Sequence, residues 1–191
     1  MTTGLQVSKE EMLKFVARRS AMKSSDKAYV DVLLPNHGRE IFNILGPGVS
    51  ENPSDVNLKP AISGVPDFNL AYVRNKPGER GALHAHDTTE VFIPMSGRWQ
   101  IIWGDEEEHS LELEEGDVIA IPPGVFRCFK NIGTTEQWML AILAGEKHGR
   151  LVWPKKVLDQ VRDIGPTVGI GFDSAGNIFR LEKTESEIGG K

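Results

Sequence analysis

The chain has 191 residues, of which 39% are hydrophobic, and this is enough for one compact domain with a buried core. Its 22 Lys and Arg residues against 27 Asp and Glu residues give a net charge of −5. With no long basic run, a nucleic-acid partner is not expected. A single cysteine, Cys128, excludes an internal disulfide framework.

Targeting segments are not evident in the chain. The first twenty residues carry too many charges for the apolar core of a signal peptide, and no apolar run is long enough to cross a bilayer. We therefore expect a cytoplasmic protein with no membrane partner.

Residues 1–67 are expected to form an N-terminal helix, short strands and a connection rich in Pro and Gly. Ser8 and Glu11 have the spacing of a capping box, and apolar residues then recur at helical intervals, which predicts an amphipathic helix over residues 8–22 that packs outside the main body. Apolar runs at 29–34 and 40–45, separated by a Pro-Asn-His-Gly segment, predict two strands. Residues 46–67 are predicted to be irregular.

Residues 68–144 show a series of short apolar runs broken by turn residues, which is typical of a β-sandwich or jelly roll. The predicted strands are residues 68–74, 90–95, 99–103, 109–113, 117–121, 127–131 and 138–144. The run at 90–95 is apolar at nearly every position after Glu90, so we expect both of its faces to be covered, one by the core and one by a helix or a second subunit. A homodimer is the simpler expectation.

Residues 145–191 are predicted to form a C-terminal helix and tail packed on the same domain. Apolar residues at helical spacing predict a helix over 155–164 that ends at Gly165 and Pro166. A hairpin is expected between residues 167 and 181, around residues 174–177.

Three candidate metal ligands, His84, His86 and Glu90, lie within seven residues. Side chains two apart on a strand share a face, so the two histidines point the same way. Along an extended chain Glu90 would lie ~20 Å from His84. The intervening Asp-Thr-Thr segment is suited to a turn that brings the carboxylate back. Two imidazoles and one carboxylate suit Fe(II), Mn, Ni or Zn and leave positions open for a substrate.

These residues also resemble the two sequence motifs of the cupin superfamily. The first motif, G-x5-H-x-H-x3,4-E-x6-G, is matched at Gly78, His84, His86, Glu90 and Gly97. The second, G-x5-P-x-G-x2-H-x3-N, is matched at Gly116, Pro122, Gly124 and Asn131, but Arg127 stands where the motif has histidine. The resemblance implies an all-β fold, a cupin-type double-stranded β-helix or jelly-roll barrel, here at residues 68–144 and with N- and C-terminal helical extensions.

Arg127 leaves three interpretations open, because a guanidinium has no lone pair for a metal. In the first, His84, His86 and Glu90 form a three-ligand site while Arg127 turns outward or binds a substrate carboxylate. In the second, Arg127 pairs with Glu90 and replaces the metal. In the third, His109 or His148 takes the vacant ligand position.

The resemblance, together with the donor set, predicts a metal-dependent enzyme acting on a small organic, anionic substrate. An Fe(II) oxygenase is the first choice, with His84, His86 and Glu90 holding the metal and Arg127 orienting the substrate. The main alternative is a non-catalytic cupin that binds or senses a small ligand around an Arg127–Glu90 pair. A metal-assisted isomerase or lyase would use the same ligands without oxygen.

Overall fold

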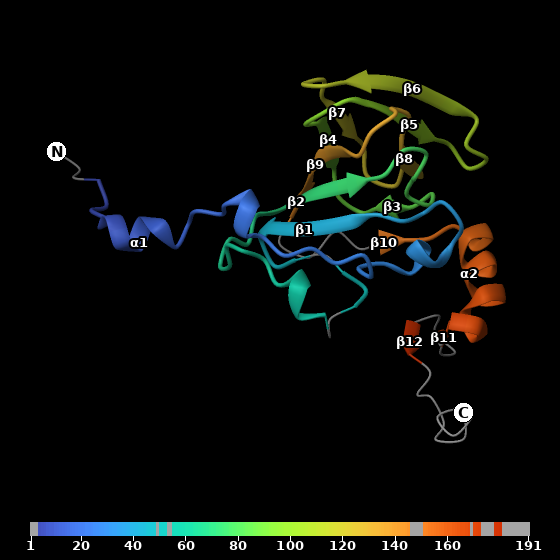
Figure 1. Cartoon of the computed structure of the whole chain (residues 1–191), viewed down its shortest axis with the longest axis horizontal. Coiled ribbons are helices and arrows are strands. Elements are labelled where there is room, and N and C mark those ends of the chain that lie inside the picture. Colours follow the sequence, from blue (N-terminus) through green and yellow to red (C-terminus); the bar gives the residue numbers. More distant parts are fainter. Residues whose placement is uncertain are drawn as a thin grey trace.

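Two antiparallel β-sheets packed face to face form the body of the protein (Figure 1). The computed structural model describes residues 4–48, 50–52, 55–145, 151–168, 170–172 and 178–180. The five strands of the larger sheet lie in the order β1 (Glu40–Leu45), β2 (Phe68–Asn75), β9 (Gln137–Ala144), β4 (Glu90–Pro94) and β7 (Ile119–Ile121). The smaller sheet has the order β6 (His109–Glu114), β5 (Arg98–Trp103) and β8 (Arg127–Asn131).

A two-stranded ribbon continues the smaller sheet beyond β8. It consists of β3 (Ala85–His86) and β10 (Leu151–Val152). An isolated antiparallel bridge joins His84, just before β3, to Arg127 at the start of β8. The strands predicted between residues 68 and 144 are therefore all present, with ends that differ by at most two residues, and the fold is the expected all-β jelly-roll barrel.

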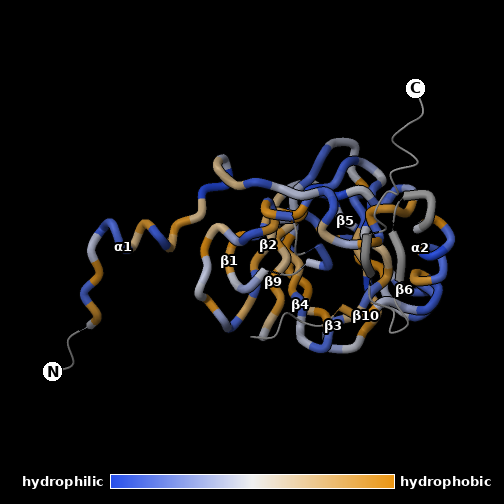
Figure 2. Tube along the Cα trace, turned by 90° about the horizontal axis from the view of Figure 1, so that it is seen from below, coloured by the Kyte–Doolittle hydropathy of each residue, from blue (hydrophilic) through white to orange (hydrophobic). Residues whose placement is uncertain are grey.

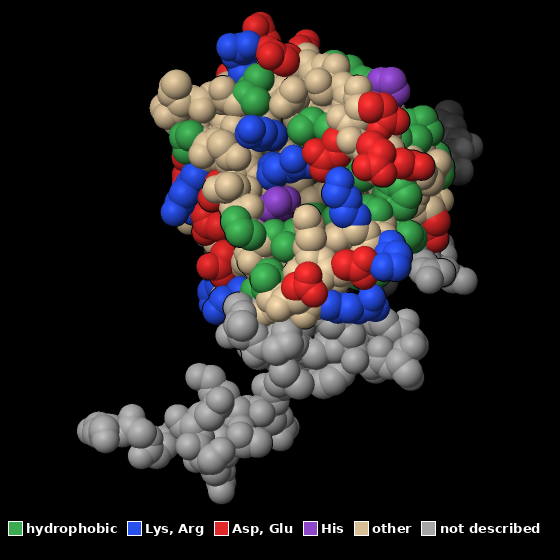
Figure 3. Space-filling view, turned by 90° about the vertical axis from the view of Figure 1, so that its right-hand side faces the viewer, with side chains coloured by type: hydrophobic (Ala, Val, Ile, Leu, Met, Phe, Trp, Pro, Cys, Tyr) green, Lys and Arg blue, Asp and Glu red, His purple; other side chains and the backbone are tan. Residues whose placement is uncertain are grey.

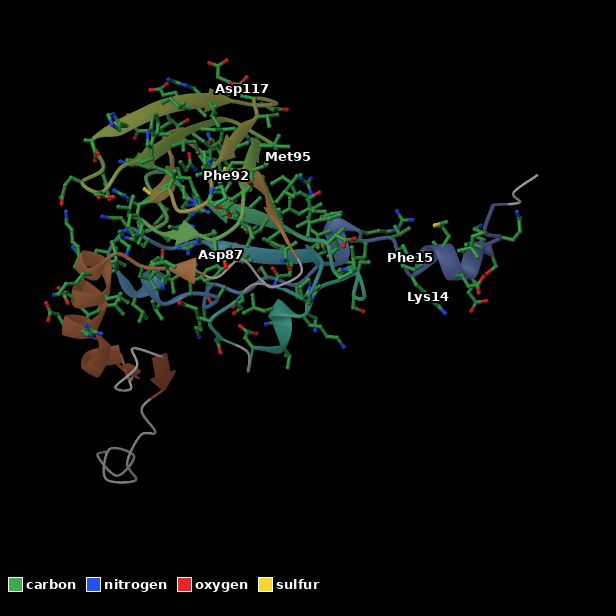
Figure 4. The ribbon with its side chains drawn as sticks, turned by 180° about the vertical axis from the view of Figure 1, so that it is seen from behind. Lys14, Phe15, Asp87, Phe92, Met95 and Asp117 are labelled. Atoms are coloured by element: carbon green, nitrogen blue, oxygen red, sulfur yellow. The ribbon has the colours of Figure 1, made fainter. Side chains whose placement is uncertain are left out.

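The main core lies between the two sheets, where the inward side chains of both meet. Phe92 on β4, Trp99 and Ile101 on β5 and Met139 on β9 are fully buried there. Figure 4 marks Phe92 within the body of the barrel. Burial of alternate residues on facing strands is what the two-residue repeat of a strand predicts.

A second apolar cluster covers the outer side of the smaller sheet. Ile102 and Cys128 point away from the barrel interior and pack with Val157 and Val161 of helix α2 (Lys155–Val168). Helix α2 is seen beside the barrel, with its apolar side toward the body and its polar side outward (Figure 2). Because side chains alternate along a strand, Cys128 and its neighbour Arg127 lie on opposite faces of β8.

The N-terminal segment differs from the sequence prediction in two places. The predicted helix over residues 8–22 is only α1 (Lys9–Leu13) followed by a 3-10 turn, η1 (Arg19–Ala21). The capping box of Ser8 and Glu11 forms as expected, but α1 projects away from the body with Lys14 and Phe15 beyond its end (Figure 4). Without a packed apolar face, so short a helix gains no stability from tertiary contacts, and this accounts for its early end.

The strand predicted at residues 29–34 was also wrong, because Val30–Leu33 is a 3-10 turn, η2. An apolar run of this length does not distinguish a strand from another buried segment. The strand predicted at 40–45 is β1, and it adds to the larger sheet beside β2. The connection over 46–67 is irregular apart from η3 (Val56–Leu58) and one isolated bridge at Ile62.

The C-terminal helix is longer than predicted, since α2 runs through Gly165 and Pro166 to Val168. Pro166 removes one backbone donor but does not end the helix. Strands β11 (Ile170–Phe172) and β12 (Ile178–Arg180) form the expected hairpin. Its turn, at residues 174–177, lies outside the described residues.

None of the helices in the described part of the chain combines the length and apolar character that crossing a membrane requires. On the face shown in Figure 3, acidic and basic side chains are interspersed. This distribution agrees with the absence of a long basic run in the sequence.

Candidate metal centre and cavity

The two histidines are positioned by backbone pairing at the end of the smaller sheet. His84 forms an antiparallel bridge with Arg127, with N···O distances of 3.0 and 2.9 Å in the two directions. His86 pairs with Leu151 of β10, and its carbonyl accepts the N–H of Gly124 at 2.8 Å. Both imidazoles are buried, and their ring centroids lie 5.3 Å apart. The expected shared face of His84 and His86 is confirmed.

Glu90 is brought back toward the histidines by a turn over residues 87–89, as the sequence predicted. Figure 4 marks Asp87 in this turn, at the rim of the barrel. Glu90 begins β4, where its backbone pairs with both Leu143 and Ile121. Its Oε1 lies 4.0 Å from Nε2 of His86, and one potential ligand atom from each of His84, His86 and Glu90 lies within 4.8 Å of the others.

His84 is a neutral imidazole with one ring nitrogen engaged in a hydrogen bond. Its Nδ1 lies 2.8 Å from the carbonyl oxygen of Ala82, and a carbonyl only accepts, so Nδ1 carries the proton and Nε2 keeps its lone pair. Burial, followed by the positive charge of Arg127, holds the pKa of His84 well below its usual range. A neutral imidazole is the form that binds a metal.

Arg127 points into the barrel wall and is only 1% exposed. Its Nε donates to Oε2 of Glu90 at 3.0 Å, and Nη2 donates to the same oxygen. Its Nη1 donates to the carbonyl of His84 at 3.2 Å and lies 3.5 Å from the carbonyl of Val125. The outward orientation considered from the sequence does not occur, and the Arg127–Glu90 pair does.

The donor set is compatible with a divalent ion despite this pair. Both bonds from Arg127 to Glu90 go to Oε2, whereas Oε1 is the oxygen that faces His86. A carboxylate that binds a metal is often held by a hydrogen bond from outside the coordination sphere. Small side-chain movements would bring the three donors within reach of one ion, so His84, His86 and Glu90 fit a three-ligand site with Arg127 behind the carboxylate.

These three residues lie in the wall of a cavity that is partly open to solvent and has an accessible interior volume of about 60 Å³. The cavity is lined mainly by apolar side chains from β1, β2, β4, β8 and β9, and its polar lining residues are Tyr29, Arg39, Asn43, Asn69, His84, His86 and Glu90. Arg127 is not among the lining residues.

A buried ion pair lies beside the cavity, at the start of β1. Arg39 donates to Asp31 through two bonds of 2.8 and 2.7 Å, and Asp31 also accepts the backbone N–H of Ala82 at 2.8 Å. Because Ala82 accepts from His84, the pair anchors the segment that carries the first histidine. Both Asp31 and Arg39 are buried.

Trp153 links the same region to the C-terminal segment. Its ring lies 5.7 Å from that of His84, and its indole N–H donates to Oε1 of Glu51 at 2.7 Å. The other oxygen of Glu51 accepts the N–H of Val30 at 3.0 Å. Burial raises the pKa of Glu51, against the effect of these two bonds.

The remaining candidate histidines do not join the site in the described part of the chain. The side chain of His109 is 59% exposed on β6, where its ring lies beside that of Trp103. His148 lies outside the described residues. The third interpretation is therefore wrong for His109 and is not addressed for His148.

Sequence reasoning did not single out Asn69, Arg39 or Asp31. Asn69 has the same strand parity as the inward residues Ala71 and Val73. A polar residue at an inward position of this strand could therefore have identified Asn69 from the sequence as a cavity residue. No local pattern connects Arg39 to Asp31, because the turn between them had been expected to separate two strands.

Comparison with known proteins agrees with the barrel. The family model described as "Cupin domain" matches residues 71–143. A curated relative, "Germin-like protein subfamily 1 member 5" from Arabidopsis thaliana, is 26% identical over 129 residues. That alignment covers 64% of this chain and 58% of the relative, so this chain spans less than two thirds of the length of that protein.

Solved structures with a related barrel have low sequence identity to this chain. A cupin 2 domain-containing protein from Halorhodospira halophila has a TM-score of 0.48 and 20% identity, over 70% of this chain and 82% of that one. The DMSP lyase DddQ from Ruegeria pomeroyi DSS-3 has a TM-score of 0.44 and 15% identity, over 59% of this chain and 49% of that one. Neither match indicates an activity for this chain.

Proposed function

We propose that this chain, whose residues 71–143 match the cupin domain model, is a metal-dependent enzyme acting on a small organic molecule in the barrel cavity. The observation that carries the proposal is the convergence of His84, His86 and Glu90 on the wall of that cavity. Buried polar groups are costly unless they are paired or bind a metal. Three ligand-type residues in one small region favour a metal.

The reaction class that we propose first is oxygenation by Fe(II). Two histidines and one carboxylate are the donor set of many non-haem Fe(II) oxygenases. Fe(II) held by these residues would supply open coordination positions and electrons for oxidation. Mn, Ni or Zn could bind the same donors. With such an ion, an isomerase or lyase reaction is the alternative within the same site.

The protein's own residues have separate tasks in this proposal. The Nδ1–H bond to Ala82 keeps the Nε2 lone pair of His84 directed at the site. Arg127 acts as a positioning residue that holds Glu90 through Oε2. Its donors are engaged by Glu90 and by backbone carbonyls, so orientation of a substrate by Arg127 would require one of these bonds to break.

A second candidate function is supported by the same ion pair. A buried guanidinium neutralises Glu90 without a metal, and a barrel stabilised in this way could bind a small ligand without catalysis. Its positive charge also opposes a nearby dication. This alternative predicts no metal in the purified protein.

Elemental analysis of protein purified without chelator separates the two functions. We expect a stoichiometric first-row metal in the wild type and its loss in His84→Ala, since that variant keeps the backbone bridge but removes one donor. His109→Ala, which removes an exposed imidazole, is the matched control and should retain the metal. Unchanged metal content in a folded His84→Ala variant would contradict the site assignment.

The metal identity then directs the test of activity. If iron is found, oxygen uptake should be measured with a panel of small organic substrates, with anionic ones included. Consumption of substrate without oxygen uptake would favour the isomerase or lyase alternative.

We propose also that the protein is a homodimer. Leu70, Leu140 and Ile142 are only partly buried on the outer face of the larger sheet, and neighbouring strands place them side by side. A second copy covering this face would remove their remaining apolar surface from water. The mass would be measured by light scattering during size-exclusion chromatography, and a monomer mass would contradict this proposal. A cytoplasmic location stays a prediction.

A further inference from the structure

Asn69 lines the cavity and carries a buried hydrogen-bond donor with no partner in the described part of the chain. The residue is 5% exposed, lies on β2 and lines the cavity. Its Oδ1 accepts the N–H of Gly48 at 3.0 Å, which fixes the orientation of the amide. Its Nδ2 has no hydrogen-bond partner among the residues that the structure describes. Buried donors are normally satisfied, so this atom indicates a ligand that supplies an acceptor.

The strand register relates this amide to the candidate metal centre. Asn69 pairs with Leu143, and Leu143 pairs with Glu90 on its other side. The three residues form one row across the larger sheet, so the Cα atoms of Asn69 and Glu90 are about 10 Å apart, two strand spacings. One small molecule lying along this row can reach both.

The wall between these two points is apolar and includes small side chains. Leu143 lies between Asn69 and Glu90 in the row, and Ala71 and Ala141 form the next pair along the same strands. All three line the cavity. The middle of the ligand is therefore expected to be apolar.

The Asn69 end of the cavity favours a neutral acceptor over an anion. The guanidinium that lines the cavity, that of Arg39, lies near the opposite end of β2, since Glu40 pairs with Arg74, and it already donates two bonds to Asp31. The amide of Asn43 donates to the carbonyl of Leu58 at 2.6 Å. Among the described residues that line the cavity, no cation is free to compensate the desolvation of a carboxylate buried beside Asn69. A carbonyl oxygen of an amide, ester or ketone needs only the Nδ2–H donor.

We propose that Asn69 determines specificity by donating from Nδ2 to a neutral carbonyl oxygen of the substrate. The substrate class is a small molecule with an apolar middle, this carbonyl at one end and a polar group at the His84–His86–Glu90 end. The part of this inference that concerns the polar group at the His84–His86–Glu90 end rests on the function proposed above. The Asn69 contact itself does not need a metal.

Binding of linear primary amides, from butanamide to octanamide, tests the proposal on the full chain. Calorimetry and the side-chain amide signals in ¹⁵N NMR spectra would be recorded with the chelator-treated protein and again with added Fe(II) or Zn(II). We expect at least one amide of the series to bind and to shift the Asn69 Nδ2 signals. The carboxylate of the same length should bind more weakly at the Asn69 end.

Asn69→Asp is the informative variant, because it keeps an oxygen for the Gly48 N–H and replaces the donor by an acceptor. It should weaken binding of the amide by about tenfold or more. Asn57→Asp changes an amide outside the cavity and serves as control. If Asn69→Asp destabilises the fold, Asn69→Ser offers a smaller donor and should retain part of the affinity.

The outcomes separate this inference from the proposed function. Amide binding that depends on Asn69 but not on any metal supports the inference even if the protein proves metal-free. A protein with a His84-dependent metal whose amide affinity and Asn69 signals are unaffected by Asn69→Asp would overturn the inference alone. Tighter binding of the carboxylates at Asn69 would also overturn it.

Discussion

Replacement of Arg127 by methionine tests the buried pair at the centre of the site. Methionine has a similar length but removes the charge and every donor. Glu90 would then remain in the barrel wall without the partner that both Nε and Nη2 now supply. Removing one member of a buried ion pair costs about 3–5 kcal/mol of unfolding free energy.

That cost is large enough for a simple assay. In a domain of this size a loss of 1 kcal/mol lowers the melting temperature by about 2–4 °C, so we expect a decrease of roughly 6–20 °C. Urea unfolding in the presence of chelator gives the free energy directly. Arg98→Met breaks an exposed pair with Glu112 and, as the matched control, should cost less than about 1 kcal/mol.

The metal affinity of Arg127 variants tests the same ion pair in a second way. Without the guanidinium the full charge of Glu90 is available to an ion, so Arg127→Met should bind a divalent metal more tightly than the wild type and regain stability with it. Metal at a hundred times its Kd restores about 2.7 kcal/mol. Arg127→His adds a donor as well and should bind more tightly still.

Two results would refute this reasoning about the pair. One is an Arg127→Met variant no less stable than Arg98→Met. The other is a folded Arg127→His variant with a metal Kd equal to that of the wild type, as measured by competition with a chelator.

Three further predictions concern the surroundings of the site. Asp31→Asn should lower the unfolding free energy by about 3–5 kcal/mol, because it leaves the buried Arg39 unpaired. Asp159→Asn, on the exposed surface of α2, is the control and should change the unfolding free energy by less than about 1 kcal/mol. Equal losses in the two variants would contradict the role of the Asp31–Arg39 pair. Phe92→Ala should cost about 3–5 kcal/mol in urea unfolding because its ring is fully buried, and a loss below 1 kcal/mol would show a loosely packed core. Burial raises the pKa of Cys128 to about 11, so at pH 8 the thiol is protonated and should react with a thiol reagent many times more slowly in the native protein than in urea; equal rates would contradict its burial.

Much of the fold follows from local patterns in the sequence. Apart from the short β3, the strands between residues 68 and 144 have apolar side chains with turn residues between them, and their ends were predicted to within two residues. Gly97 illustrates the turn chemistry, with a φ of 70° and no space for a Cβ, which would lie 2.1 Å from the side chain of Gln137. The errors fall at residues 8–22 and 29–34, where helix length and local conformation depend on packing partners remote in sequence.

The candidate ligands could be identified from sequence because they are close in the chain. His84 and His86 share a face by strand parity, and a three-residue turn suffices to bring back Glu90. The residues that shape the rest of the cavity come from distant segments. Asn69 lies in the same row as Glu90 only because β9 pairs with both of their strands. Arg39 reaches Asp31 only after the intervening chain folds back.

The sequence by itself therefore determined the barrel and the three candidate ligands, while the tertiary structure decided the position of Arg127. Strand parity states that Arg127 and Cys128 face opposite ways but does not state which one faces inward. Packing of Cys128 against α2 and pairing of Arg127 with Glu90, 37 residues away in the chain, settle the direction. Only folding could show that the guanidinium binds one oxygen of Glu90 while the other faces the histidines, because this depends on contacts between strands that no local pattern encodes.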